Sequence, residues 1–238
     1  MSVLTWPSQN FLLNAMPQEA VERLCPDLER VPMNASQVLY ESGVAIRDVY
    51  FPATAIVSMS YSMENGSSAE IALIGREGMV GLPLLFGTTH STVQATVQSA
   101  GLGFKLPGRS LINEFERGGK LMQVLLSYAG SLIEQMQQTA ACNRHATLEQ
   151  RLCRWLLLTL DRLPGNELTM THESIAVTLG VKREGVTEVA SRLRHEGAIH
   201  YRRGHIEVLD RPIIERHACE CYRMTRLDPA HQVRPSVA

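Results

Sequence analysis

The stretch from His172 to Ser191 restricts the fold of this chain more than any other part of the sequence. Apolar and small side chains recur there at helical spacing on both sides of a glycine: Ile175, Ala176 and Leu179 precede Gly180, and Val181, Val186 and Val189 follow it. Glycine adopts positive φ without steric cost, so Gly180 can form a sharp turn between two helices. The small side chain of Ala176 allows the two helices to cross closely. The pattern therefore predicts a helix-turn-helix.

The second helix of this motif would carry polar and charged side chains on the face opposite its valines. They are Lys182, Arg183, Glu184, Thr187, Glu188 and Ser191. Groups of these kinds hydrogen-bond base edges and phosphates when a helix lies in the major groove of DNA. A helical hairpin with a solvated outer face would show the same pattern, so the motif by itself leaves both interpretations open.

A short β-hairpin with a basic tip is predicted directly after the motif. Apolar residues alternate with polar ones over 199–201 and again over 206–208, and a glycine lies between the two runs. Arg202 and Arg203 would lie at the tip. One interpretation is that they only increase the solubility of the protein. After a helix-turn-helix, a basic hairpin is more simply interpreted as a wing that holds DNA phosphates.

The first hundred residues predict β-structure after an opening helix over 10–24. Short strand-like runs recur between turn residues, at 37–40, 48–51, 55–61, 69–74, 94–97 and 101–106. Asn65-Gly66 is a strong hairpin signal, because both residues tolerate positive φ. Runs of this length and spacing are typical of a small antiparallel barrel or jelly roll.

A long helix is predicted from Gly119 to Asn143, and its most regular apolar stripe suggests a role. The stripe has three-four spacing and comprises Leu121, Leu125, Tyr128, Leu132, Gln135, Thr139 and Cys142. Such a stripe is covered either by its own chain or by a second copy. Dimerisation would give a DNA reader a second half-site, which favours the paired helix. A further helix over 148–163 would anchor the core of the C-terminal domain.

Together these elements predict an α+β chain with four parts. An N-terminal antiparallel β-roll (jelly roll) would occupy residues 1–118, a dimerisation helix 119–143, and a winged helix-turn-helix 144–227, followed by a frayed tail over 228–238. The charge follows this division. Residues 1–143 hold 8 Lys and Arg against 12 Asp and Glu, whereas 144–238 hold 15 against 12. The basic half is the one that carries the motif, as phosphate binding requires.

Other function classes find little support in the sequence. We predict no catalytic site, no cofactor and no metal site, since nucleophile elbows, P-loops and Cys-x-x-Cys pairs are missing. Glu114 and Glu116 are expected on a solvated helix face. Cys142 and Cys153 are expected as buried thiols, and the Cys-Glu-Cys segment at 219–221 could make a redox or metal contact. With neither a secretory leader nor a membrane span evident, a cytoplasmic location is expected.

The order of β-roll, long helix and winged helix resembles the Crp/Fnr family of bacterial transcription regulators, over residues 10–225. The most specific segments are Ile-Gly-Arg-Glu-Gly-Met-Val-Gly-Leu-Pro at 74–83 and Leu-Gly-Val-Lys-Arg-Glu-Gly-Val-Thr at 179–187. In that family an Arg-Glu pair opens the recognition helix and reads G·C pairs, which implies that role for Arg183 and Glu184. Arginine can bond guanine bidentately and glutamate can accept from cytosine. The family's next base contact is often arginine, but Glu188 stands there in this sequence.

The effector site of the family is altered here. Relatives that bind cyclic nucleotides carry Gly-Glu-Leu for the ribose and then Arg-Ser or Arg-Thr for the phosphate. This chain has Leu82 after Gly81, and its 88–92 segment contains His90, Ser91 and Thr92 but no arginine. Burying a cyclic phosphate without a cationic partner is costly. We therefore expect a degenerate pocket, with an unknown effector or none.

Three functions remain open from the sequence. The favoured one is a homodimeric transcription regulator that binds a pseudo-palindromic operator in double-stranded DNA. The resemblance also implies RNA polymerase as a partner. The second is the same architecture gated by a cyclic nucleotide. The third is a barrel enzyme or ligand-binding protein with an incidental helix-turn-helix, which the missing catalytic groups disfavour.

Overall fold

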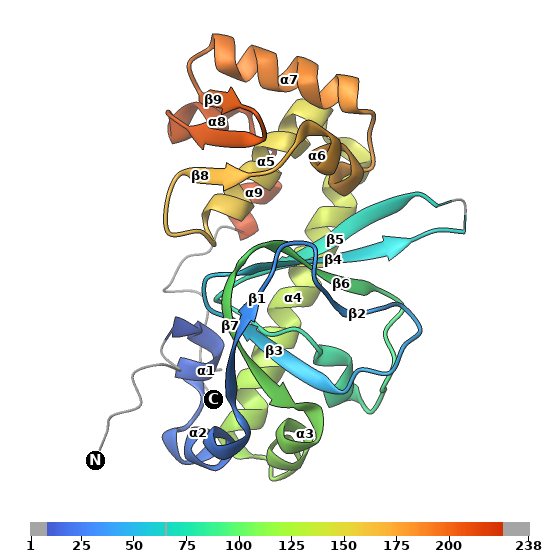
Figure 1. Cartoon of the computed structure of the whole chain (residues 1–238), viewed down its shortest axis with the longest axis vertical. Coiled ribbons are helices and arrows are strands. Elements are labelled where there is room, and N and C mark those ends of the chain that lie inside the picture. Colours follow the sequence, from blue (N-terminus) through green and yellow to red (C-terminus); the bar gives the residue numbers. More distant parts are fainter. Residues whose placement is uncertain (1–8, 65, 226–238) are drawn as a thin grey trace. The chain divides into compact units, whose positions relative to one another are not determined.

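The computed structural model describes residues 9–64 and 66–225 (Figure 1). These residues form two compact units. The first comprises 9–59 and 74–133, and the second comprises the described residues of 60–73 together with 134–225. The boundary falls inside the long helix, at 133–134, rather than at either of its ends. The tail predicted over 228–238 lies outside the described residues. No helix within the described ranges combines the length and the apolar character needed to span a bilayer.

The opening segment forms two helices instead of one, α1 (Phe11–Ala15) and α2 (Gln18–Leu24), followed by the 3₁₀ turn η2 (Cys25–Asp27). Pro17 caps α2, and its fixed backbone separates the two helices. Asn10 caps α1 by accepting from the amide of Leu13 at 2.9 Å. Its buried Nδ2 also donates to the carbonyls of Pro52 and Gly78, at 2.8 and 2.9 Å. One asparagine thus attaches α1 to two other segments of the unit.

The predicted β-roll consists of two sheets (Figure 1). The first has the order β1-β7-β3 and comprises β1 (Glu29–Met33), β7 (Gly101–Pro107) and β3 (Asp48–Pro52). The second has the order β2-β6-β4-β5 and comprises β2 (Val38–Tyr40), β6 (Gln94–Ser99), β4 (Ile56–Ser62) and β5 (Ser68–Ile74). All six predicted strands are present, and β1 is an additional one. Buried side chains such as Phe51, Ile56 and Phe104 fill the space between the strands.

Two short helices close this unit, η3 (Leu82–Phe86) and α3 (Gly108–Glu116). Glu114 on α3 corrects an expectation, because it is buried rather than solvated. Its carboxylate accepts from Nε of Arg23 at 3.0 and 3.1 Å and pairs with Nε of Arg117 at 3.2 Å. A buried carboxylate needs such cationic partners to remain charged. Glu116 is exposed, as expected.

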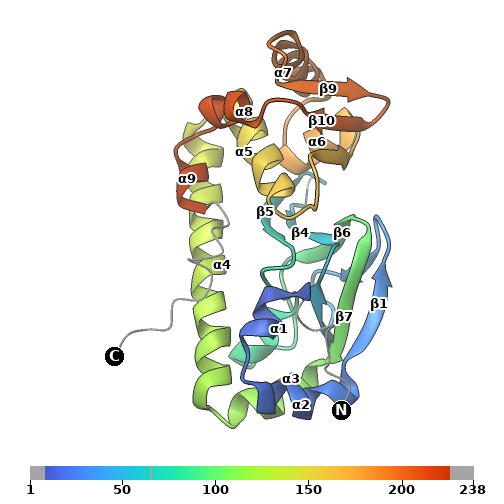
Figure 2. The same cartoon turned by 90° about the vertical axis from the view of Figure 1, so that its left-hand side faces the viewer.

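The predicted long helix is α4 (Gly119–His145), which Figure 2 shows as one continuous element. Gly118 and Gly119 both have positive φ, +75° and +72°, which permits the sharp change of direction after α3. In the first unit, Tyr128 donates its hydroxyl to the carbonyl of Met79 at 2.8 Å. Gly78 leaves room for that ring, since a Cβ there would lie 2.5 Å from Tyr128 Cε2.

The second unit is built around α5 (Leu148–Leu160), in which every residue from Leu152 to Leu160 is buried. Thr147 and Gln150 form a capping box at its start. The other elements are β8 (Glu167–Thr169), α6 (His172–Leu179), α7 (Arg183–His195), β9 (Ile199–Arg202), β10 (His205–Val208), α8 (Arg211–His217) and α9 (Cys221–Thr225). The strands form one sheet of order β8-β10-β9, so β8 adds a third strand to the predicted hairpin.

Candidate nucleic-acid interface

The helix-turn-helix is formed by α6 and α7, and its geometry follows from local sequence. Thr171 caps α6 by accepting from the amide of Ser174 at 3.1 Å. Gly180 ends the helix in the left-handed region, at φ 63° and ψ 41°. The amide of Val181 then donates back to the carbonyl of Ala176 at 2.9 Å, which satisfies a terminal carbonyl of α6. The turn predicted at Gly180 is therefore present in the expected conformation.

The β9–β10 hairpin has a two-residue turn with an unusual occupant. Arg202 pairs with His205 across the hairpin, which leaves Arg203 and Gly204 at the tip. Both have positive φ, +47° and +83°. A turn of this kind favours Asn or Gly at its first position, because most other residues are strained at positive φ. Arg203 is exposed in this conformation, so a cation is held at the tip.

An open groove of about 660 Å³ lies between α7, the start of α6 and the wing. Four residues of the predicted DNA-contacting set line it: Arg183, Thr187, Ser191 and Arg203. The other four, which do not line this groove, are exposed: Lys182, Glu184, Glu188 and Arg202. Lys182 and Glu184 lie at the start of α7, and Arg202 lies on the wing beside Arg203. All eight therefore lie on the solvent-facing side of α7 or on the wing.

Sequence reasoning missed several residues of this groove, above all Arg194. Arg194 is exposed and lines the groove with Arg183, eleven residues earlier on the same helix. Eleven residues are about three turns at 3.6 residues per turn, so the two side chains share a face. That spacing was available in the sequence. Thr171, His172, Glu173 and Tyr201 also line the groove, but their approach depends on how α6 and β9 pack against α7.

His172 fixes the wall of the groove where α6, α7 and the wing meet. Its ring stacks on Tyr201 with centroids 4.1 Å apart and planes 22° apart. Its Nδ1 lies 3.0 Å from Oγ1 of Thr187, and that hydroxyl also donates to the carbonyl of Arg183 at 3.0 Å. Burial lowers the pKa of His172, and the nearby Arg183 lowers it further. The ring is thus biased toward its neutral form.

Glu188 is engaged within the protein. Its carboxylate pairs with Nη1 of Arg192 at 2.8 Å, and Nη2 of Arg192 pairs with Glu149 at 2.9 Å. Glu149 also lies 2.7 Å from Nδ1 of His217, whose Nε2 lies 2.8 Å from Glu196. The network connects α5, α7 and α8. The side chain of Glu188 is still 74% exposed, so its pairing with Arg192 competes with solvent and with any other donor.

The predicted dimer stripe on α4 is corrected by the structure. Leu121, Leu125, Tyr128 and Leu132 are all buried by the chain itself. Gln135 accepts from the amide of Leu73 at 2.9 Å, and Thr139 accepts from Arg154 at 3.2 Å. These side chains are therefore not free to face a second copy. Of the two alternatives for this stripe, coverage by its own chain is the correct one.

The residues expected at the effector site do not form an open phosphate cradle. Gly81 has φ +106°, and a Cβ there would lie 2.8 Å from Val49. Leu82 is buried, as is Ser91, whose hydroxyl accepts from the amide of Val93 at 3.1 Å. His90 and Thr92 are exposed. Among the five residues expected at this site, none is an arginine or a lysine that could pair with a phosphate, and His90 is the one side chain that can carry a positive charge.

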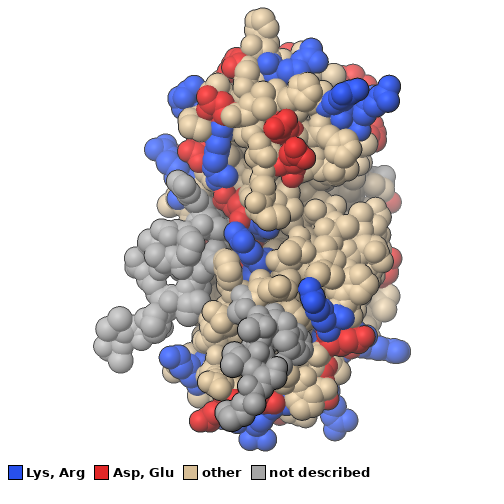
Figure 3. Space-filling view, turned by 60° about the vertical axis from the view of Figure 1, so that its left-hand side comes forward, with Lys and Arg blue, Asp and Glu red and all other residues tan. Residues whose placement is uncertain are grey.

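Basic side chains around the interface are mixed with acidic ones. Figure 3 shows small groups of lysine and arginine side chains, with aspartate and glutamate between them, on the face that it draws. On α7 and the wing the cations include Arg183, Arg194, Arg202 and Arg203, and Glu184 stands beside Arg183.

Residues 150–216 match a family model described as the Crp-like helix-turn-helix domain. A search of curated proteins finds no match. A solved structure from Eubacterium rectale, described as a transcriptional regulator of the Crp/Fnr family, has a TM-score of 0.70 at 16% identity. It covers 91% of this chain and 99% of its own.

Two further solved structures are similar over four fifths of the chain. A CRP/FNR-family regulator from Thermus thermophilus has a TM-score of 0.63 at 24% identity and covers 80% of this chain and 98% of its own. The c-di-GMP-responsive regulator CLP from Xanthomonas campestris has a TM-score of 0.65 at 16% identity, with 81% and 99% covered. The chain therefore has the fold of the Crp/Fnr transcription regulators and carries their helix-turn-helix domain at 150–216.

Proposed function

We propose that this protein is a homodimeric, sequence-specific DNA-binding regulator of transcription that does not use a cyclic nucleotide as its effector. The observation that carries the proposal is the groove between α7 and the wing. Its polar side chains on α7 recur at Arg183, Thr187, Ser191 and Arg194, and Arg203 faces them from the hairpin tip. A helix laid in a major groove presents one such stripe to base edges, while a wing contacts the phosphate backbone.

Arg183 is the best candidate for base reading, and Arg203 for phosphate contact. Arg183 is exposed at the first turn of α7, where recognition helices contact bases. Arginine presents paired donors that match guanine O6 and N7. Thr187 is held by His172 and by the carbonyl of Arg183. We therefore assign Thr187 to positioning rather than to direct base contact.

Dimerisation is assigned to an exposed face of α4 beside the buried stripe, where Leu126 and Ile133 directly follow Leu125 and Leu132. Exposed residues on that face recur at alternating spacings of four and three: Leu126, Gly130, Ile133, Gln137 and Ala140. Leu126 and Ile133 are 44% and 51% exposed, so two large apolar side chains lie two turns apart on this face. Nothing lies within 4 Å of a Cβ placed at Gly130, so packing within the chain does not require glycine there. A second helix approaching closely would.

The absence of a cyclic-nucleotide response rests on the residues that replace the usual ligands. Leu82 is buried and offers no acceptor to a ribose hydroxyl. Ser91 uses its hydroxyl on the Val93 amide. A lost bond to a charged group costs roughly 1.5–3 kcal/mol, and each 1.4 kcal/mol is about tenfold in affinity. Micromolar binding of cyclic AMP or cyclic GMP is not expected.

The proposal is tested by selecting bound fragments from a pool of random duplex DNA with the full-length protein. Enrichment of a two-fold symmetric sequence, with half-sites about one helical turn (~34 Å) apart, is expected. The selection is repeated with cyclic AMP and with cyclic GMP, and should return the same sequence at the same affinity. Failure to enrich any sequence contradicts DNA reading. Enrichment only in the presence of a nucleotide would favour the cyclic-nucleotide-gated alternative.

A further inference from the structure

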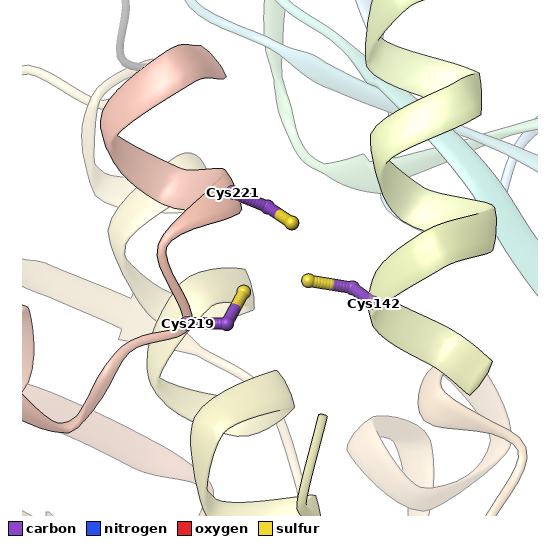
Figure 4. Close-up of side chains that lie close together, drawn as sticks. All are labelled: Cys142, Cys219 and Cys221. Carbon is purple, nitrogen blue, oxygen red and sulfur yellow. The ribbon is translucent and has the colours of Figure 1, made fainter. Parts of the chain in front are cut away.

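Three cysteine side chains from distant parts of the second unit converge on one point. Figure 4 shows Cys142, Cys219 and Cys221 with their sulfur atoms directed toward one another. The three sulfur atoms all lie within 4.8 Å of one another. The cluster brings Cys142 together with two cysteines that lie 77 and 79 positions later in the sequence. None of these thiols belongs to the groove of α7 and the wing.

The cluster is held by ordered elements and has one accessible side. Cys142 is 3% exposed on α4, and Cys219 is 7% exposed in the segment that leads into α9. Cys221, the first residue of α9, is half-buried. Tyr222 follows it, is 2% exposed, and accepts a hydrogen bond from Arg211. Packing of Tyr222 therefore fixes the short helix that supplies one of the three thiols, and the partial exposure of Cys221 leaves a route for a small ion.

A buried positive charge lies beside the cluster. Arg154 is 7% exposed, and its Nε has no hydrogen-bond acceptor among the described residues. Arg151 and Arg154 line the same cavity as Cys142. Buried guanidinium groups are stabilised by neighbouring anions, which three neutral thiols do not supply.

We propose that Cys142, Cys219 and Cys221 form a three-thiolate site for one thiophilic metal ion of the Zn²⁺, Cd²⁺ or Cu⁺ class. A zinc–sulfur bond is about 2.3 Å long, so three sulfur atoms around one ion lie roughly 3.8–4.0 Å apart. All three sulfur–sulfur distances are at most 4.8 Å, so none needs to shorten by more than about 1 Å to reach this range. Soft thiolate ligands select ions of this class over magnesium or calcium.

The chemistry of binding is a ligand exchange without oxidation or reduction. Each thiol that ligates the ion releases its proton to solvent, and the ion gives up water molecules in return. For Zn²⁺ or Cd²⁺ the three-thiolate complex carries one negative charge, which Arg154 can offset. A fourth coordination position remains for water, as in other zinc sites with three protein ligands. The bound ion would join α9 to α4 within the second unit.

A disulfide is the competing use of these thiols, and the geometry favours the metal. A disulfide would join two of the three sulfur atoms, and the third would remain an unreacted thiol next to it. The structure instead gathers all three. The two uses are separated by counting free thiols and by measuring metal binding under the same reducing conditions.

The test uses full-length protein, reduced and freed of metal by a chelator. Titration with Cd²⁺ should produce the ultraviolet charge-transfer absorption of cadmium–thiolate bonds, saturating at one ion per chain. Competition against a chromophoric chelator gives the Zn²⁺ affinity. Cys221→Ser and Cys142→Ser should each weaken it ~100-fold or more, since losing even an outer-shell partner costs ~10–100-fold. The matched control is Cys25→Ser, which changes a thiol in the other unit and should bind normally.

A second measurement guards against variants that fail to fold. Zn²⁺ should raise the melting temperature of the parent and of Cys25→Ser, because an ion that binds only the folded state stabilises it. Circular dichroism should show native helix content in Cys221→Ser, whose melting temperature should not respond to Zn²⁺. Three outcomes would overturn the proposal. The first is the absence of a charge-transfer band, and the second is a Zn²⁺ affinity of folded Cys221→Ser equal to that of the parent. The third is a disulfide that persists in the presence of the reductant, in place of metal binding.

Discussion

Arg203 illustrates at the scale of one residue how a functional group can conflict with local backbone preference. The first position of the β9–β10 turn has φ +47°, where Asn or Gly would be favoured. Arg203 is nevertheless exposed there and lines the groove with Arg183 and Arg194. A strained residue at a binding surface is accounted for if its side chain contacts the ligand. We interpret Arg203 as a phosphate contact retained at some cost in stability.

The substitution Arg203→Asn should separate these two effects. Relief of the strained backbone should raise the free energy of unfolding by ~1 kcal/mol. Loss of one phosphate contact should weaken binding to all DNA sequences alike and reduce the slope of log K against log salt by about 0.9. Urea denaturation and binding isotherms at several salt concentrations check both. A variant that is less stable, or one that binds DNA with an unchanged salt slope, contradicts the assignment.

Single residues also show how far the sequence could be used to predict the site. The positions of Arg183 at the start of α7 and of Gly180 in the turn were predictable, because they follow from helical periodicity and backbone conformation. Arg194 was equally predictable from its three-turn distance to Arg183. The convergence of Cys142 with Cys219 and Cys221 was not, since it depends on how α9 packs against α4. The burial of Glu114 depends on Arg23, which is far from it in the sequence.

At the scale of elements, α4 shows the limit of pattern analysis most clearly. The sequence predicts its length within two residues, because the apolar periodicity is unbroken. Two of its faces, however, carry apolar residues at three-four spacing, and periodicity does not state which one faces inward. The richer stripe, with Leu121, Leu125 and Leu132, is buried by the chain itself. Strand β1 was missed because its Pro32 and its two charged residues argue against a strand. Proline is tolerated there because β1 lies at the edge of its sheet.

The exposed face of α4 gives a prediction about assembly. Ile133→Arg would place two like charges against each other across a two-fold seam, which is unfavourable by on the order of several kcal/mol. Sedimentation should show a dimer for the parent and a folded monomer for the variant. Ser127→Arg is the matched control, because Ser127 is exposed on the polar side of the same helix. If Ile133→Arg remains dimeric, the seam lies elsewhere.

At the scale of the whole molecule, the ion pairs that hold the first unit together make its stability depend on pH. The hydrogen bond from Arg23 lowers the pKa of Glu114 below its ordinary value. A carboxyl group with a depressed pKa stabilises the fold fully above its unfolded pKa, and this contribution is lost as pH falls through the folded value.

Glu114→Gln should remove this contribution. The difference in the free energy of unfolding between parent and variant should be largest near neutral pH and should shrink below about pH 4, the ordinary range for a glutamate. Urea denaturation at a series of pH values measures it. A difference that grows as the pH falls would show that burial, and not the ion pair with Arg23, dominates at Glu114.

We propose that the exposed face of α7 reads DNA sequence. The most direct measurement is the ratio of affinities for the selected operator and for a shuffled duplex, in the parent, in Arg183→Ala and in Arg216→Ala. Arg216 is an exposed arginine on α8 outside the groove, and its loss changes the net charge equally. Arg183→Ala should reduce the difference in binding free energy between the two duplexes by roughly 1–3 kcal/mol, with little change in affinity for the shuffled duplex. Arg216→Ala should leave the ratio of affinities unchanged. An equal loss on both duplexes for Arg183→Ala would contradict the claim.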